Sequence, residues 1–158
     1  ELDFIRVEGF VFGHLGDAGY HDSCAGELLR YRKHIGAEHV AVFADVKKKH
    51  ASHAITEDVH ILETARAAEL FLADGVIVTG NATGQEVSMF DLKSLHHKLN
   101  IPILLGSGVT PDNLPQLWNY AEGFIIGSYL KKDGIWKNAP DPDRLANMQS
   151  TLQNLKKR

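Results

Sequence analysis

Five short apolar segments without polar alternation constrain the fold of this chain more than any other sequence feature. Each is rich in Val, Ile, Leu or Phe, as is typical of strands that are covered on both faces. Segments with apolar residues at helical spacing separate them, which predicts β-α units and a parallel sheet with right-handed crossovers. The predicted strands are Phe4–Val7, His39–Val46, Gly75–Gly80, Ile101–Gly108 and Gly123–Ser128.

The helices are predicted from apolar stripes and from start signals. The segment from Thr56 to Asp74 has the clearest stripe, with Thr56 as its expected N-cap. Asp22 or Ser23 is the expected cap of the first helix, and Thr110 followed by Pro111 is a typical helix start. The predicted helices cover residues 22–38, 56–74, 91–100, 110–122 and 141–158.

This α/β pattern fits two architectures, an open doubly wound sheet and a (β/α)8 TIM barrel. The later strands begin at shorter intervals than the earlier ones, which favours the closing half of a barrel. A full barrel takes about 250 residues, whereas this chain has 158 and does not begin with Met. We therefore predict a single incomplete TIM-barrel domain over residues 1–158, a fragment that supplies the C-terminal five-eighths of the barrel with Phe4–Val7 as its fourth strand.

Composition narrows the class of partner. Lys and Arg total 17 and Asp and Glu total 20, so the net charge of −3 argues against a nucleic-acid partner. Cys24 is the only cysteine, which excludes an intrachain disulfide. The apolar runs fall short of the roughly 20 residues of a membrane helix, and the first residues do not resemble a secretion signal. We expect an intracellular protein of the cytoplasm or an organelle matrix that does not insert into membranes, and a homo-oligomer remains open.

Glycines end two consecutive late strands, and this pattern predicts an anion site. Gly106, Ser107, Gly108 and Val109 follow one strand, and Gly127 and Ser128 follow the next. Glycine lets the backbone approach a ligand closely, and late barrel strands often bind phosphate at this end. The alternative is that these glycines only make tight turns.

Acid-base candidates follow the second predicted strand. Asp45 ends this strand, and three lysines (residues 47–49), His50 and His53 come next. Asp45, Lys47 and His50 are the candidates for proton transfer, and a lysine there could also form a Schiff base. A divalent metal held by Asp45, His50 and His53 is an alternative, but the loop spacing fixes no geometry. We therefore expect no cofactor, and at least one of the lysines to be an ordinary solvated side chain.

Two further strand ends carry candidates. Arg6 and Glu8 lie two apart on the first strand and share a face; Glu8 is either a general acid or base or a rim ion-pair partner, and Arg6 is a candidate phosphate ligand. The third strand ends in Thr79 and Gly80, which could contact a polar ligand, as could Thr83 and Gly84 beyond it, or simply form a turn.

Four other residues are expected to have mainly structural roles. His96 and His97 are expected on the surface of a helix, and Cys24 is expected to be a packed thiol at a helix start, although that position could lower its pKa. Trp136 follows the last strand, where it either packs or covers the site.

Several separate motifs resemble the BtpA/SgcQ family in the same order along nearly the whole chain. They are DFIRVEG, AGELLRYRKHIGAEHVAVFADVKKKHASHAIT, ADGVIVTGNATGQE, ILLGSGVTPDNL and GFIIGSYLKKDGIWKNAPDPDRL. The resemblance implies a phosphate-binding (β/α)8 barrel related to phosphosugar-handling barrels, in which further N-terminal strands precede these motifs. Glu8 departs from the pattern, because an Asn-like residue is expected there.

The resemblance implies two classes of function. One is an enzyme acting on a phosphorylated sugar or nucleotide-like metabolite, as a lyase, isomerase or transferase. The other is a non-catalytic assembly or stability factor of the photosystem I biogenesis type. Acid, base and anion groups clustered at strand ends favour the enzyme, because a scaffold has no need to gather them there.

Overall fold

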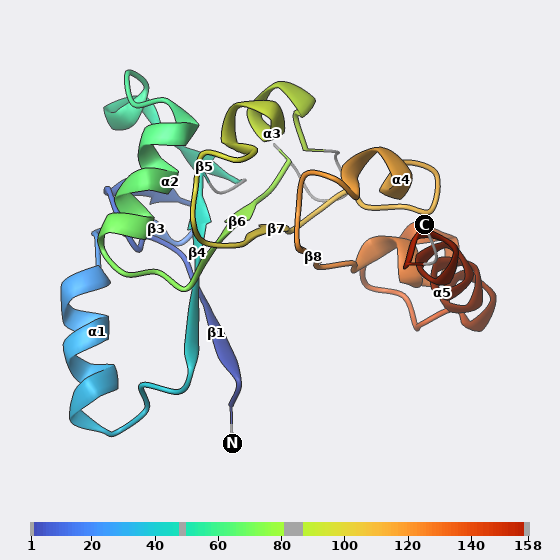
Figure 1. Ribbon diagram of the computed structural model, residues 1–158, viewed down its shortest axis with the longest axis horizontal. Helices are drawn as coiled ribbons and strands as arrows, with labels where there is room; N and C mark the ends of the chain where they lie inside the picture. Colours follow the sequence, from blue (N-terminus) through green and yellow to red (C-terminus); the bar gives the residue numbers. More distant parts are fainter. Residues whose placement is uncertain (1, 48–49, 81–86, 157–158) are drawn as a thin grey trace.

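The computed structural model describes residues 2–47, 50–80 and 87–156 and is built around a five-stranded parallel sheet (Figure 1). The strand order is β1-β4-β6-β7-β8, so these strands follow one another in space as they do along the chain. A doubly wound sheet reverses its order at a switch point, whereas a barrel does not. The prediction of five parallel units of a TIM barrel is therefore confirmed. The strands are β1 (Phe4–Val7), β4 (Ala41–Val46), β6 (Gly75–Val78), β7 (Ile103–Leu105) and β8 (Gly123–Phe124).

The core lies between the sheet and its helices. Alternate residues of the central strands are fully buried there, among them Val42, Ala44, Val76 and Leu105. Ala65 and Ala68 of α2 pack into this core, and small side chains let that helix lie close to β4 and β6. The helices are α1 (Ala25–His34), α2 (Ile61–Leu70), α3 (Met89–Leu95), α4 (Leu114–Leu117) and α5 (Pro142–Lys156).

The opposite face of the sheet carries a different set of side chains. Phe4 of β1 contacts Phe43 of β4 with ring centroids 5.3 Å apart, and Phe4 is 52% exposed. Farther along the same face, Asp45 and Thr79 lie toward the carboxyl ends of their strands. The face is thus apolar at the amino ends of the strands and polar at the carboxyl ends, where barrels place their sites.

A small antiparallel sheet was not predicted. It joins β2 (His14–Gly16), β3 (Gly19–His21) and β5 (Ala51–Ser52) in the order β3-β2-β5. Gly19, with a φ of 110°, makes the turn of the β2–β3 hairpin. Because these strands follow β1 and β4, the small sheet lies beyond the carboxyl ends of those two strands (Figure 1).

Several predicted boundaries are wrong. Cys24, not Asp22 or Ser23, is the N-cap residue of α1. Helix α2 begins at Ile61 after His60, whose Nδ1 accepts a hydrogen bond from the Leu62 backbone, while Thr56 ends a short 3-10 turn. Except for β1, the strands are shorter than expected.

Residues Thr110 and Pro111 do not begin a helix, contrary to the prediction. The Asn113 side chain accepts a hydrogen bond from the Thr110 backbone at 2.9 Å and donates one to the Gly108 carbonyl at 2.8 Å. Thr110 Oγ1 in turn accepts a hydrogen bond from the Asn113 backbone at 3.4 Å, and the Leu114 backbone donates to the Thr110 carbonyl at 2.9 Å, so Thr110 and Asn113 form a capping box. The regular helix α4 nevertheless starts only at Leu114, because Pro115 has no N–H to donate to the Pro111 carbonyl.

Candidate functional site

The two glycine-containing strand ends line one cavity of about 420 Å³, which we call the glycine pocket. The ends of β7 and β8 form one side, and the segment before α5 forms the other. The structure thus brings together Ser107, Gly108, Val109, Gly127 and Ser128 from the predicted phosphate residues. The complete lining is Gly106, Ser107, Gly108, Val109, Thr110, Ile125, Gly127, Ser128, Tyr129, Lys131, Gly134, Trp136 and Arg144.

At two positions in this pocket, the backbone geometry or the close packing requires glycine. Gly108 has a φ of 69°, in the left-handed region where a side chain is strained. At Gly106, an added Cβ would lie 2.8 Å from Ile77 Cγ2 and 3.0 Å from Thr79 Cγ2. The loop after β7 can therefore pass close to β6 only with glycine at position 106.

Ser107 links the ends of β6 and β7 through a hydrogen bond. It is 7% exposed, and its Oγ accepts a hydrogen bond from the Gly80 backbone at 2.7 Å. Thr79 and Gly80 are buried beside it and do not line the glycine pocket. Their placement therefore fixes the ends of β6 and β7 to each other, next to the pocket.

Two cations of the glycine pocket were missed by the sequence reasoning. Lys131 and Arg144 both line it. Arg144 lies in the first turn of α5, where a positive charge opposes the helix dipole. A cation at such a position is the sequence signal that could have identified it.

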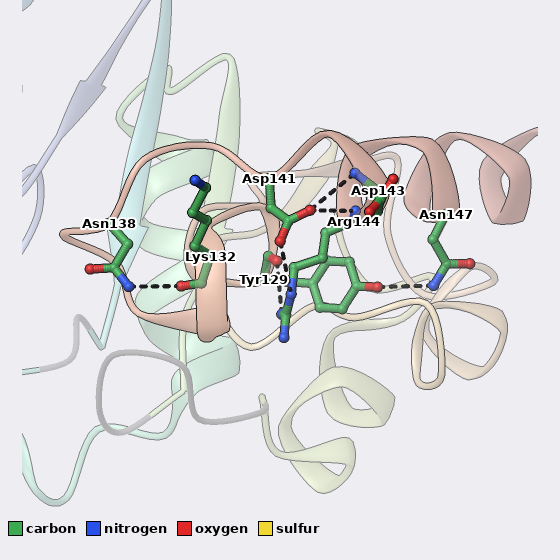
Figure 2. A network of polar contacts seen from close by, with 7 residues as sticks. All are labelled: Tyr129, Lys132, Asn138, Asp141, Asp143, Arg144 and Asn147. Atoms are coloured by element: carbon green, nitrogen blue, oxygen red, sulfur yellow. Dashed lines mark hydrogen bonds and ion pairs between the residues drawn. The ribbon is translucent and has the colours of Figure 1, made fainter.

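A polar network fixes Arg144 (Figure 2). Its Nη1 donates to the Tyr129 carbonyl at 3.1 Å, and its guanidinium lies 5.1 Å from the centre of the Tyr129 ring. Asp141 accepts hydrogen bonds from the backbone of Asp143 and Arg144, and its other oxygen is 4.0 Å from Arg144 Nε. Asn147 holds the Tyr129 hydroxyl at 3.0 Å. The guanidinium is therefore held in place at the edge of the pocket.

A second group of side chains, the charged cluster, gathers at the carboxyl ends of β1 and β4. It consists of Arg6, Asp45 and Lys47. Arg6 Nε and Nη2 each donate to one oxygen of Asp45 at 2.8 Å, in a bidentate pair. The Asp45 side chain is 0% exposed and that of Arg6 is 34% exposed. The hydrogen bond to Asp45 raises the pKa of Arg6 above its ordinary value, and the charge of Glu8 acts in the same direction.

Arg6 connects the charged cluster with the glycine pocket. A Cβ added to Gly106, which lines the pocket, would lie 3.5 Å from Arg6 Nη2. The guanidinium thus lies between Asp45 and the loop after β7. Exposed Glu8 lies close enough for its charge to act on Arg6.

Lys47 and His50 are placed differently from each other. Lys47 Nζ donates to the Thr56 carbonyl at 2.6 Å and lies 3.4 Å from its hydroxyl. Burial lowers the pKa of Lys47, and the charge of Asp58 partly opposes this change. His50 is exposed, with a φ of 56°. Lys48, Lys49, Thr83 and Gly84 lie outside the described residues.

Three imidazoles lie beside the charged cluster. The ring of His14 stacks on that of His21 at 5.1 Å and contacts that of His53 at 5.3 Å. His14, His53, Asp45 and Lys47 line a hollow of only about 20 Å³. Within residues 2–47, 50–80 and 87–156, no three His, Cys, Asp or Glu side chains form a group that could hold a metal ion.

The remaining residues singled out from the sequence lie outside the charged cluster, and of these only Trp136 lines the glycine pocket. Burial raises the pKa of the Cys24 thiol, as is expected of a packed thiol and not of an activated one. His96 follows the end of α3 and contacts the Tyr120 ring, and His97 has a φ of 57°, so neither is mid-helix as predicted. Trp136 is 69% exposed at the pocket.

None of the helices in the part of the chain that the structure describes has the length and apolar character needed to cross a membrane.

Comparison with known proteins gives one family. Residues 1–154 match the BtpA family. An uncharacterized mitochondrial protein of Caenorhabditis elegans is 45% identical over 99% of this chain and 56% of its own length. An uncharacterized protein of Methanocaldococcus jannaschii is 40% identical, over 99% of this chain and 58% of its own. The photosystem I biogenesis protein BtpA of Synechocystis is 37% identical over 97% of this chain and 53% of its own length. The chain thus spans little more than half the length of these relatives.

A solved structure supports the fold. Thiamine phosphate pyrophosphorylase from Pyrococcus furiosus matches with a TM-score of 0.61 over 96% of this chain and 60% of that chain. The two sequences are 15% identical, so the likeness concerns the fold alone.

Proposed function

The chain belongs to the BtpA family, and we propose that it forms the phosphate-binding part of a barrel enzyme that acts on a phosphorylated sugar or nucleotide-like metabolite. One observation carries the proposal: the backbone of two glycine-containing strand ends and two cations, Lys131 and Arg144, line the same cavity. Backbone N–H groups beside fixed cations are the partners that a phosphate group prefers.

The cavity suits a small ligand. Its volume of about 420 Å³ lies within the range of small-molecule pockets. Arg144 is already fixed by Tyr129 and Asp141, so little of its side-chain freedom would be lost on binding. The proposed phosphate contacts are the backbone of Ser107–Val109 and Gly127–Ser128, with Arg6 reaching from the other side of Gly106.

The charged cluster supplies the proposed chemistry. Burial lowers the pKa of Lys47 from its ordinary value, which makes Lys47 the stronger candidate for proton transfer. Asp45 accepts two hydrogen bonds from Arg6 and fixes that guanidinium. Glu8 and His50 are exposed and remain candidates for a second proton-transfer group.

A pair of glycine variants tests the phosphate site. Gly108 and Gly36 have nearly the same φ, 69° and 67°, but only Gly108 lines the glycine pocket. Alanine strains the backbone similarly at both positions. We expect Gly108→Ala to weaken inorganic phosphate binding about tenfold, the order of one lost charge-assisted hydrogen bond, and Gly36→Ala to leave it unchanged. Isothermal titration calorimetry measures both, and equal affinities in the two variants would refute the proposal.

An assembly factor of the photosystem I biogenesis type is the second candidate. The observation in its favour is the 37% identity to the photosystem I biogenesis protein BtpA of Synechocystis. On this hypothesis the barrel acts as a binding surface without turnover. Gly108→Ala would then leave the assembly function intact, whereas an enzyme that uses the phosphate site would lose activity with that variant.

A further inference from the structure

Trp136 is the feature of the glycine pocket that phosphate binding alone does not explain. It lines the cavity, yet 69% of the residue is exposed. An indole ring beside a row of phosphate-binding groups offers a flat apolar surface to whatever is attached to the phosphate. Such surfaces stack on the faces of nucleobases irrespective of base sequence.

The loop that carries Trp136 is held in one conformation. The Lys132 backbone donates to the Ala139 carbonyl at 3.0 Å. The Asn138 side chain donates to the Lys132 carbonyl at 3.0 Å, a bond drawn in Figure 2. The Asn138 backbone donates to the Ile135 carbonyl at 2.9 Å. These bonds close the loop on both sides of Trp136, so its backbone is fixed before any ligand arrives.

The same loop approaches the cation of the site. At Gly134, with a φ of 70°, an added Cβ would lie 3.4 Å from Arg144 Nη1. Trp136 therefore follows closely after the point where the loop meets the guanidinium. An anion beside Arg144 and an aromatic group on Trp136 can belong to one small molecule, because both residues line a single cavity of about 420 Å³.

We propose that the glycine pocket binds the phosphate monoester of a heteroaromatic nucleoside, with the nucleobase stacked on Trp136 and the phosphate against the Gly106–Thr110 loop and Arg144. This inference rests on the proposed phosphate site and names the substrate class for it. Trp136 and Ile125 give the lining an apolar surface that a phosphate or sugar group alone would not use.

Three ligands separate the phosphate from the base. Isothermal titration with inorganic phosphate, ribose 5-phosphate and adenosine 5′-monophosphate measures what each added group contributes. We expect the nucleotide to bind at least about tenfold more tightly than ribose 5-phosphate, the lower range of one base-aromatic stack. Adenosine without the phosphate should bind far more weakly than the nucleotide.

Two tryptophan variants test whether Trp136 causes the preference for the nucleotide over ribose 5-phosphate. Trp136→Leu should abolish the tenfold preference and leave the affinity for inorganic phosphate within twofold. Trp118, which stacks on Phe124 with centroids 5.7 Å apart, is the matched control. Trp118→Phe should keep the preference, and in this variant the nucleotide should quench the emission of Trp136, the remaining tryptophan.

The outcomes distinguish this inference from the proposed function. If ribose 5-phosphate binds as tightly as the nucleotide, or if Trp136→Leu retains the preference, the base subsite is wrong and the phosphate site stands. If adenosine equals the nucleotide, a joint site for base and phosphate is wrong. If none of the phosphate ligands binds, the phosphate site and the inference fall together.

Discussion

The glycine pocket and the charged cluster lie at the same end of one sheet but are built in opposite ways. The glycine pocket is a cavity of about 420 Å³ whose lining includes four glycines and two cations, Lys131 and Arg144. Asp45 and Lys47 of the charged cluster line a hollow of only about 20 Å³, although Lys47 also borders an open hollow of about 430 Å³. The ionic side chains of the cluster bind one another or nearby backbone. The glycine pocket is therefore built around a cavity, and the charged cluster around paired charges.

This difference assigns distinct tasks to the two regions. A site that binds a ligand gains affinity from polar groups that are positioned in advance and still have room for a partner. A group that shifts protons needs a controlled environment more than it needs space. Arg6 does not line the glycine pocket but lies between the two regions, because it pairs with Asp45 and lies next to Gly106.

The largest effect is expected from breaking the charged cluster. Asp45→Ala removes a fully buried carboxylate and leaves the Arg6 guanidinium without its partner. We expect the free energy of unfolding to fall by about 3 kcal/mol, at the lower end for a broken buried pair because Arg6 is partly exposed. Chemical denaturation measures the change.

An exposed ion pair is the control for this variant. Glu63 and Arg66 lie 3.5 Å apart on α2, with side chains 60% and 50% exposed. Glu63→Ala should cost less than about 0.5 kcal/mol, as exposed pairs contribute little. Equal losses in Asp45→Ala and Glu63→Ala would show that the Arg6–Asp45 pair does not hold the two strands together.

The next effect concerns the packing of the glycine pocket. Gly106→Ala places a Cβ within 3.0 Å of Ile77 and Thr79, whereas a Cβ at Gly127 meets no atom within 4 Å. We expect Gly106→Ala to cost about 2 kcal/mol, as overpacking does, and Gly127→Ala to stay within about 0.5 kcal/mol of the wild type. Thermal unfolding compares them, and a stable Gly106→Ala protein would mean that the β7 loop can move away from β6.

The sequence allowed prediction of the sheet because its strands are apolar runs without regular polar alternation, although among the five strands only β6 is buried at every residue. β1 was predicted to the residue, although Phe4 and Arg6 are exposed. The β3-β2-β5 sheet was not, because it depends on the pairing of Leu15 with Ser52, which are distant in sequence. The helix predicted from Thr110 begins only at Leu114, because Pro115 cannot donate the backbone hydrogen bond that would extend the helix toward Thr110.

The candidate site was predictable where it depends on strand ends and not where it depends on register. Glycine at consecutive strand ends indicated the glycine pocket directly. The Arg6–Asp45 pair requires strand order, because Arg6 lies opposite Phe43 and Asp45 is two residues farther along β4. Arg144 reaches the pocket from α5, which no local pattern places beside β7.

The smallest effect would sharpen the view that Lys47 lies in a controlled environment. Burial lowers its pKa from the ordinary 10.5, so between the lowered value and 10.5 the unfolded chain binds more protons than the folded one. Stability contributed by this residue therefore rises with pH through that window. We expect the free energy of unfolding of the wild type to rise across this window by less than about 0.5 kcal/mol relative to that of Lys47→Met, because the burial of Lys47 is only partial. Lys137→Met, at an exposed lysine, corrects for the loss of one positive charge. Urea unfolding across this pH range measures the difference in free energy of unfolding between wild type and Lys47→Met. If that difference stays constant or falls as the pH rises, Lys47 lies in an ordinary solvated site.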